Sequence, residues 1–68
     1  MNAEESKVVG ELEERIRSKA KEGLKGATSP QQVMTLDYQM EHSKEIALSV
    51  FGLYGIEGAR VAYQGLGN

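Results

Sequence analysis

The sequence predicts an all-α protein, a two-helix hairpin with a short N-terminal helix, a Ser-Pro loop and a long C-terminal helix, assembled into a helical polymer. Apolar residues recur every three or four positions in two stretches, which is the period of a helix. Ser29 and Pro30 mark a helix start between these stretches. Of the 8 Lys and Arg and the 10 Asp and Glu residues, only Glu57 and Arg60 lie beyond residue 45. The C-terminal half therefore looks buried, and neighbouring copies would bury it.

The first helix is expected over residues 3–22. Asn2 can cap it, with Glu5 at the third helical position completing a capping box. Its apolar residues form one narrow stripe between charged flanks, and they are Val9, Leu12, Ile16 and Ala20. Such a stripe is typical of a half-exposed helix. Gly23 and Gly26 follow, and glycine is favoured just past a helix end.

The loop is expected over residues 23–29 and the second helix over residues 30–64. Ser29 is the expected N-cap, Pro30 the first helical residue, and Gln32 the partner in a capping box. A heptad seam then runs through Val33, Leu36, Met40, Ser43, Ala47, Val50 and Tyr54. Beyond Lys44 apolar residues also fill the other faces, so several neighbours are needed to cover them.

Small residues recur in the second helix at Gly52, Gly55, Gly58 and Ala62. On a continuous helix they would form a groove where another backbone can approach closely. The alternative is that the glycines break the helix, because each costs about 1 kcal/mol relative to alanine. A continuous or kinked helix is favoured over a break, because tertiary contacts often override helix propensity.

A chain of 68 residues is short for an independent fold. It has no cysteine and one histidine, so neither a disulfide nor a structural zinc site is expected. Oligomerisation remains as the source of stability. The expected subunit interface consists of Met40, Ala47, Val50, Phe51, Gly52, Leu53, Tyr54, Gly55, Ile56, Gly58 and Ala62.

Several functional classes are not expected. Asp37, His42 and Ser43 cannot form an aligned catalytic triad on one helix, so we expect no enzyme, no cofactor and no metal. A net charge of −2 without a basic cluster argues against nucleic acid. The uncharged stretch at residues 46–56 has 11 residues, whereas a membrane span needs about 20. Residues 1–10 lack the apolar core of a signal peptide, so any export would proceed without a cleavable one.

Residues 28–66 resemble the filament subunits of type III secretion systems, which include needle, inner-rod and Hrp-pilus proteins. The likeness lies in Ser29-Pro30-Gln31-Gln32-Val33-Met34, in Gln39-Met40, and in the ending from Ala59 to Leu66 with its Ala62-Tyr63-Gln64. The chain departs from the needle pattern at Gly52, Gly55 and Gly58, where needle subunits carry polar and aliphatic residues. Needle, pilus and rod therefore stay open.

The resemblance implies a helical homopolymer around a conduit, with the C-terminal helix inward. It further implies secretion or display at the cell surface, contacts with other secretion-apparatus subunits, and a cytoplasmic chaperone. The expected function is thus a structural subunit that polymerises into a filament or conduit for protein secretion. Two alternatives remain: a non-polymeric adaptor or chaperone-like module that docks its apolar C-terminal helix on a larger partner, and a closed homo-oligomeric bundle.

Overall fold

The computed structural model describes residues 1–67, which form three helices and no strand. The helices are α1 (Ala3–Lys25), α2 (Pro30–Glu41) and α3 (Ser43–Gly65). The all-α prediction is therefore confirmed. Asn68, the last residue of the predicted subunit 1–68, lies outside the described residues. The molecule is elongated, with extents of 39, 21 and 16 Å.

Helix α1 begins with the predicted capping box. The Asn2 side chain accepts the backbone N–H of Glu5 at 2.8 Å, and the Glu5 carboxylate accepts the backbone N–H of Asn2 at 3.0 Å. The whole predicted apolar stripe is buried, together with Val8. Helix α1 continues past residue 22 because Leu36 of α2 packs against its backbone at Gly23, so that α2 covers the last turns.

Helix α2 begins at the Ser-Pro loop. Ser29 Oγ accepts the backbone N–H of Gln32 at 3.2 Å, and Pro30 is the first helical residue. The reciprocal bond of the expected capping box falls one residue earlier than predicted. Gln32 Oε1 accepts the backbone N–H of Thr28 at 2.7 Å, because Thr28 also offers its hydroxyl, at 3.2 Å. The side chain of Gln32 thus ties the loop to the helix start.

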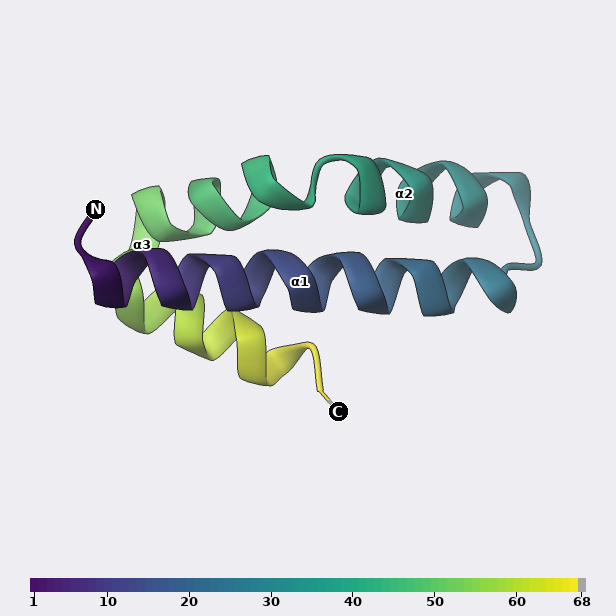
Figure 1. Cartoon of the computed structure of the whole chain (residues 1–68). Coiled ribbons are helices and arrows are strands. Elements are labelled where there is room, and N and C mark those ends of the chain that lie inside the picture. Colours follow the sequence, from purple (N-terminus) through teal and green to yellow (C-terminus); the bar gives the residue numbers. More distant parts are fainter. Residues whose placement is uncertain (68) are drawn as a thin grey trace.

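The single helix predicted over residues 30–64 is interrupted at two places. The first is His42, a non-helical residue between α2 and α3. Its N–H still donates to the Tyr38 carbonyl at 2.9 Å, and its carbonyl still accepts the Ile46 N–H at 3.0 Å. Since the hydrogen bonds bridge the interruption, the chain bends without reversing, and the first half of α3 continues along α1 (Figure 1).

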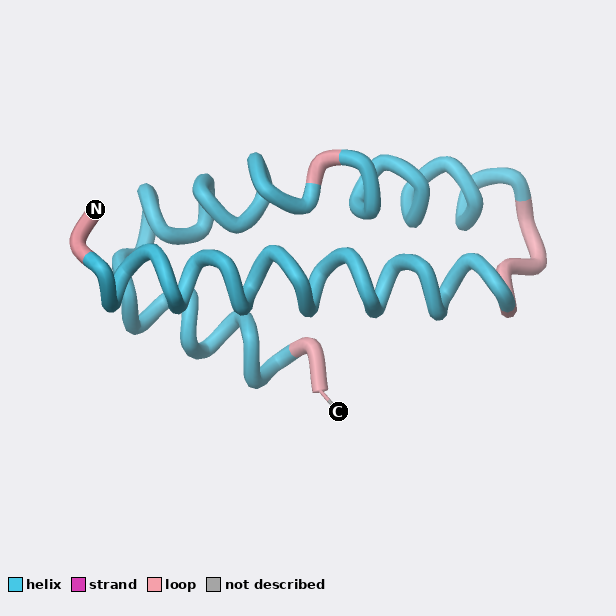
Figure 2. Tube along the Cα trace, in the orientation of Figure 1, coloured by secondary structure: helices cyan, strands magenta, loops and turns pink. Residues whose placement is uncertain are grey.

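The second interruption, at Gly55, reverses the chain. Gly55 has φ 74° and ψ −169° inside α3, a combination that is essentially restricted to glycine. Figures 1 and 2 show the chain turning beside the N-terminal end of α1 and returning along it. Residues 56–67 are called the return segment below. Of the two forms that the sequence favours, continuous or kinked, the kinked one is observed, and the kink at Gly55 is sharp enough to reverse the chain.

Gly58 explains why the turn can be so tight. A Cβ added at this position would clash with the Cβ of Tyr54, so only glycine lets the two halves of α3 meet there. Gly52 differs, because an added Cβ would have no neighbour within 4 Å. Two of the three spaced glycines thus serve the reversal.

Helix α1 lies in the middle of the fold and packs against both α2 and α3, whereas α2 and α3 scarcely touch. Two fully buried alanines mark the contacts on α3: Ala47 lies in its first half, and Ala59 lies in the return segment. Ile46, Val50, Phe51, Ile56, Ala62 and Tyr63 pack around this core. Part of the cover that the sequence analysis assigned to neighbouring copies therefore comes from the chain itself.

Candidate assembly surface

The predicted interface residues divide into three groups in the folded chain. Ala47 is fully buried. Met40, Val50, Phe51, Gly55, Ile56, Gly58 and Ala62 are half-buried. Gly52, Leu53 and Tyr54 are exposed. Only the last group presents its full surface to another molecule without any change in the fold.

Leu53 and Tyr54 form what we call the corner patch, next to the reversal at Gly55. Leu53 is 76% exposed and Tyr54 is 71% exposed, although both belong to the most apolar part of the sequence. The reversal explains this exposure, because it turns the return segment toward α1 and leaves the outer side of the corner uncovered. A contact with another molecule can therefore bury both side chains.

A second exposed group, the α2 patch, consists of Val33, Met34 and Tyr38. Met34 is 72% exposed and Tyr38 is 59% exposed. Met34 and Tyr38 line a shallow depression with Thr35, Gln39 and Ile46. Val33 belongs to the predicted heptad seam, and the expected subunit interface did not include Met34 or Tyr38. Their spacing of four residues, which puts both on one face of a helix, was the signal that could have identified them.

The two patches lie toward opposite ends of the long axis. Helix α2 follows the connection at the C-terminal end of α1, whereas the corner lies at the N-terminal end of α1 (Figure 1). The ion pair between Arg60 and Glu4, at 3.1 Å, ties the return segment to that N-terminal end. The elongated molecule thus carries two different apolar surfaces, one toward each end of its long axis.

An apolar groove lies along α1 where the return segment stops. At a rise of about 1.5 Å per residue, α1 is about 35 Å long and the helical part of the return segment about 15 Å. The groove has a volume of about 310 Å³. Its floor is the α1 stripe at Leu12, Ile16 and Ala20, and Leu36 and Val50 line it from the other side.

The return segment is held on α1 by one arginine in particular. The guanidinium of Arg15 stacks over the ring of Tyr63, 3.9 Å from its centroid, and also donates to the carbonyl of Gly67. A planar cation over an aromatic face is attractive, and the attraction grows with desolvation. Arg15 thus fixes the end of the chain against the middle of α1.

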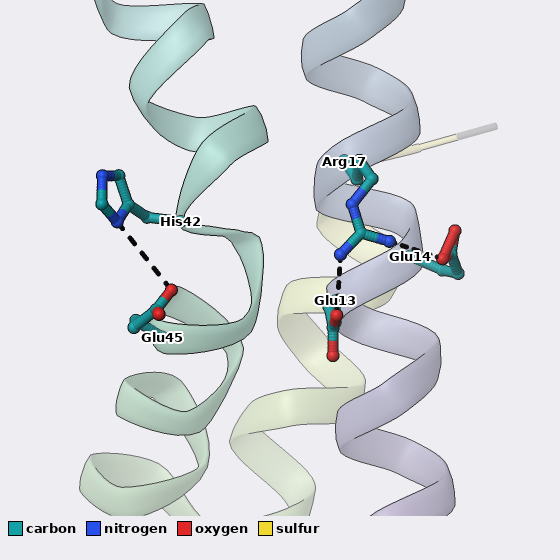
Figure 3. A network of polar contacts seen from close by, with 5 residues as sticks. All are labelled: Glu13, Glu14, Arg17, His42 and Glu45. Atoms are coloured by element: carbon teal, nitrogen blue, oxygen red, sulfur yellow. Dashed lines mark hydrogen bonds and ion pairs between the residues drawn. The ribbon is translucent and has the colours of Figure 1, made fainter.

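The remaining charges pair locally on the surface. Arg17 lies between Glu13 and Glu14 (Figure 3). Each of its two terminal guanidinium nitrogens is 2.7 Å from a carboxylate oxygen of one of them. The hydrogen bond that Arg17 donates to the Glu13 carboxylate is the largest of the effects that raise the pKa of Arg17. Arg60 pairs with Glu57 at 2.8 Å, and this hydrogen bond likewise raises the pKa of Arg60. Both arginines therefore keep their charge across all ordinary conditions.

One further contact of this kind lies at the bend between α2 and α3. Figure 3 shows the His42 ring directed toward Glu45, with Nδ1 and the carboxylate oxygen 3.9 Å apart. The ring also lies 4.3 Å from that of Tyr38 in the α2 patch. His42 thus flanks the patch.

Within residues 1–67, no three His, Cys, Asp or Glu side chains gather closely enough to hold a metal ion. Among the described helices, none has both the length and the hydropathy needed to cross a bilayer. Comparison of the chain with protein-family models, curated proteins and solved structures finds no match.

Proposed function

We propose that this chain is a structural subunit that assembles with copies of itself, head to tail. The observation that carries the proposal is the pair of exposed apolar patches at opposite ends of the molecule. A contact between two different surfaces of identical subunits repeats, and it yields a filament when the rotation does not close a ring. The corner patch of one copy would thus meet the α2 patch of the next.

The kind of filament follows from the resemblance of residues 28–66 to type III secretion subunits. On that basis the polymer is a secretion filament or conduit, displayed at the cell surface. The resemblance implies one long C-terminal helix, whereas the isolated chain folds back at Gly55. The folded chain, which carries both patches, is therefore the state from which assembly begins.

The groove along α1 favours a second candidate function. Its lining is mostly apolar, which suits anchor side chains from an amphipathic helix of another protein, as in helix-in-groove recognition. An adaptor of this kind would form a saturable complex and would not polymerise. The two candidates therefore differ in what the purified chain does alone.

Negative-stain electron microscopy and sedimentation of the purified chain over a concentration series test the proposal. Head-to-tail assembly predicts uniform filaments for the wild type. It also predicts that Leu53→Asp in the corner patch and Met34→Asp in the α2 patch each abolish them, since a buried unpaired charge is costly. Ser18→Asp, at an exposed polar position of α1, is the matched control and should leave filaments intact.

Mixing the two blocked variants gives the sharpest result. Each retains one intact patch, so the mixture should form heterodimers that cannot grow, while either variant alone stays monomeric. Filaments in both single variants would remove the proposed patches. A wild type that remains monomeric at every concentration would reject self-assembly and favour the adaptor.

A further inference from the structure

The reversal in α3 depends on the backbone of one residue. Within the described part of α3, Gly55 alone departs from helical φ and ψ, and helix continues on both sides of it without an intervening loop. A rotation at this position would extend α3 into one helix of 23 residues. The fold therefore contains a hinge one residue long.

The closed hinge leaves helix ends at the corner. The last carbonyls before Gly55 and the first N–H groups after it lack the partners they would have in a continuous helix. The corner is also where Leu53 and Tyr54 are exposed. Straightening at Gly55 restores the helical hydrogen bonds, but it removes the return segment from α1.

The contacts of the return segment with α1 do not depend on chain connectivity. Ala59 is packed in the core, Arg60 meets Glu4, and Tyr63 lies under Arg15. The Arg60–Glu4 and Tyr63–Arg15 pairs each join residues about fifty positions apart in sequence. The same segment of a second copy would make the same contacts with this α1.

We infer that the surface of α1 that binds the return segment also accepts the return segment of a second copy, through exchange about Gly55. In the exchanged form α3 is continuous, and the contacts with α1 are kept between chains. This exchange rests on the proposed self-assembly and gives it a structural route, because each subunit then inserts its C-terminal helix into its neighbour. Exchange of identical elements is a low-cost route to association.

Two glycine substitutions should shift the balance toward the exchanged form. Gly55→Ala places a side chain at a backbone conformation that only glycine adopts readily, and alanine also favours the helical alternative. The expected shift is on the order of a hundredfold in the protein concentration at which association begins. Gly58→Ala should act in the same direction, since its Cβ clashes with Tyr54 only in the closed form. Positions four apart on a straight helix have Cβ atoms about 5–6 Å apart.

Gly52→Ala is the matched control. Gly52 is helical, and an added Cβ meets nothing within 4 Å, so alanine should favour the closed and exchanged forms equally. Size-exclusion chromatography with light scattering should find larger species for Gly55→Ala and Gly58→Ala. Gly52→Ala should match the wild type.

A cross-linking experiment separates exchange from ordinary association. The chain has no cysteine, so Glu4→Cys and Arg60→Cys introduce single thiols at a site of contact. A short bis-maleimide added to a mixture of these two variants should give covalent dimers, because position 60 of one chain then lies on α1 of another. The doubly substituted chain, diluted to low concentration, should cross-link within itself.

The outcomes distinguish the exchange from the proposed function. Filaments of the doubly substituted chain, with Gly55 and Gly58 unchanged, in which the 4–60 cross-link forms only within chains would overturn the exchange and leave head-to-tail assembly standing. Absence of any association for Gly55→Ala and Gly58→Ala would also overturn it. The cross-link needs no substitution at the hinge, so it decides the question even if both hinge variants fail to fold.

Discussion

Truncation of two leucines provides a matched test of the fold and of the surface. Leu12 is fully buried in the middle of α1, and Leu53 is 76% exposed at the corner. Replacing a buried leucine by alanine costs about 2–5 kcal/mol. Because Leu12 borders the open groove, where neighbours can move inward, we expect about 2–3 kcal/mol for Leu12→Ala. Leu53→Ala should change stability by less than about 0.5 kcal/mol.

The loss expected for Leu12→Ala is large relative to the total free energy of unfolding of the chain. At about 0.05–0.15 kcal/mol per residue, a chain of 68 residues has roughly 3–10 kcal/mol of stability. A loss of 2–3 kcal/mol lowers the melting temperature by about 10–20 °C in a domain of this size. Thermal and urea unfolding, followed by far-ultraviolet circular dichroism at dilution, measures both quantities.

Leu12→Ala should have the larger effect on stability, whereas Leu53→Ala should have the larger effect on assembly. Leu→Ala removes apolar groups worth about 2.4 kcal/mol when fully buried, and 76% of the Leu53 side chain is available. The loss of about 1.8 kcal/mol raises the concentration needed for assembly about 20-fold. If Leu53→Ala destabilises the folded chain as much as Leu12→Ala, the assignment of the corner as an exposed surface is wrong.

Three further substitutions follow from the contacts of the fold. Val50→Asp places a charge beside the core and should lower the free energy of unfolding by at least about 2 kcal/mol, seen as a lower urea midpoint. Arg15→Met removes the stacking on Tyr63 and the bond to the Gly67 carbonyl; hydrogen exchange in the return segment should become about fivefold faster, as expected for about 1 kcal/mol. Ser29→Ala removes the cap of α2 and should lower the melting temperature by about 4–8 °C, and an unchanged value would show that the cap is dispensable.

The helix starts and the buried stripe of α1 could be predicted because they depend on local chemistry. Asn2 and Ser29 are short polar residues before helical stretches, and both accept the backbone N–H bonds expected of caps. The stripe was predicted from spacing alone, and burial follows from that spacing once any partner covers it. Neither inference required knowledge of the partner.

The reversal at Gly55 could not be predicted in this way. Three glycines at regular spacing suit a small-residue groove on a continuous helix as well as a break. The choice depends on whether α1 offers enough surface to hold the return segment, and that surface is made by residues such as Arg15, far away in sequence. The α2 patch was missed for a related reason. The heptad seam placed the contact face at Leu36 and Met40, and only the bend at His42 shows which side of α2 stays uncovered.

Closed and exchanged forms share their contacts with α1, so their balance depends on the hinge and on protein concentration. A segment tethered by a short linker competes at an effective concentration on the order of millimolar. The wild type should therefore stay closed at lower concentrations, where its own return segment prevails. Gly55→Ala should bring the threshold down to about ten micromolar, a hundredfold lower. A Gly55→Ala chain that sediments as a folded monomer well above that concentration would show that the hinge does not control association, whereas assembly at the lower threshold would make Gly55 the residue that keeps subunits apart until they are concentrated.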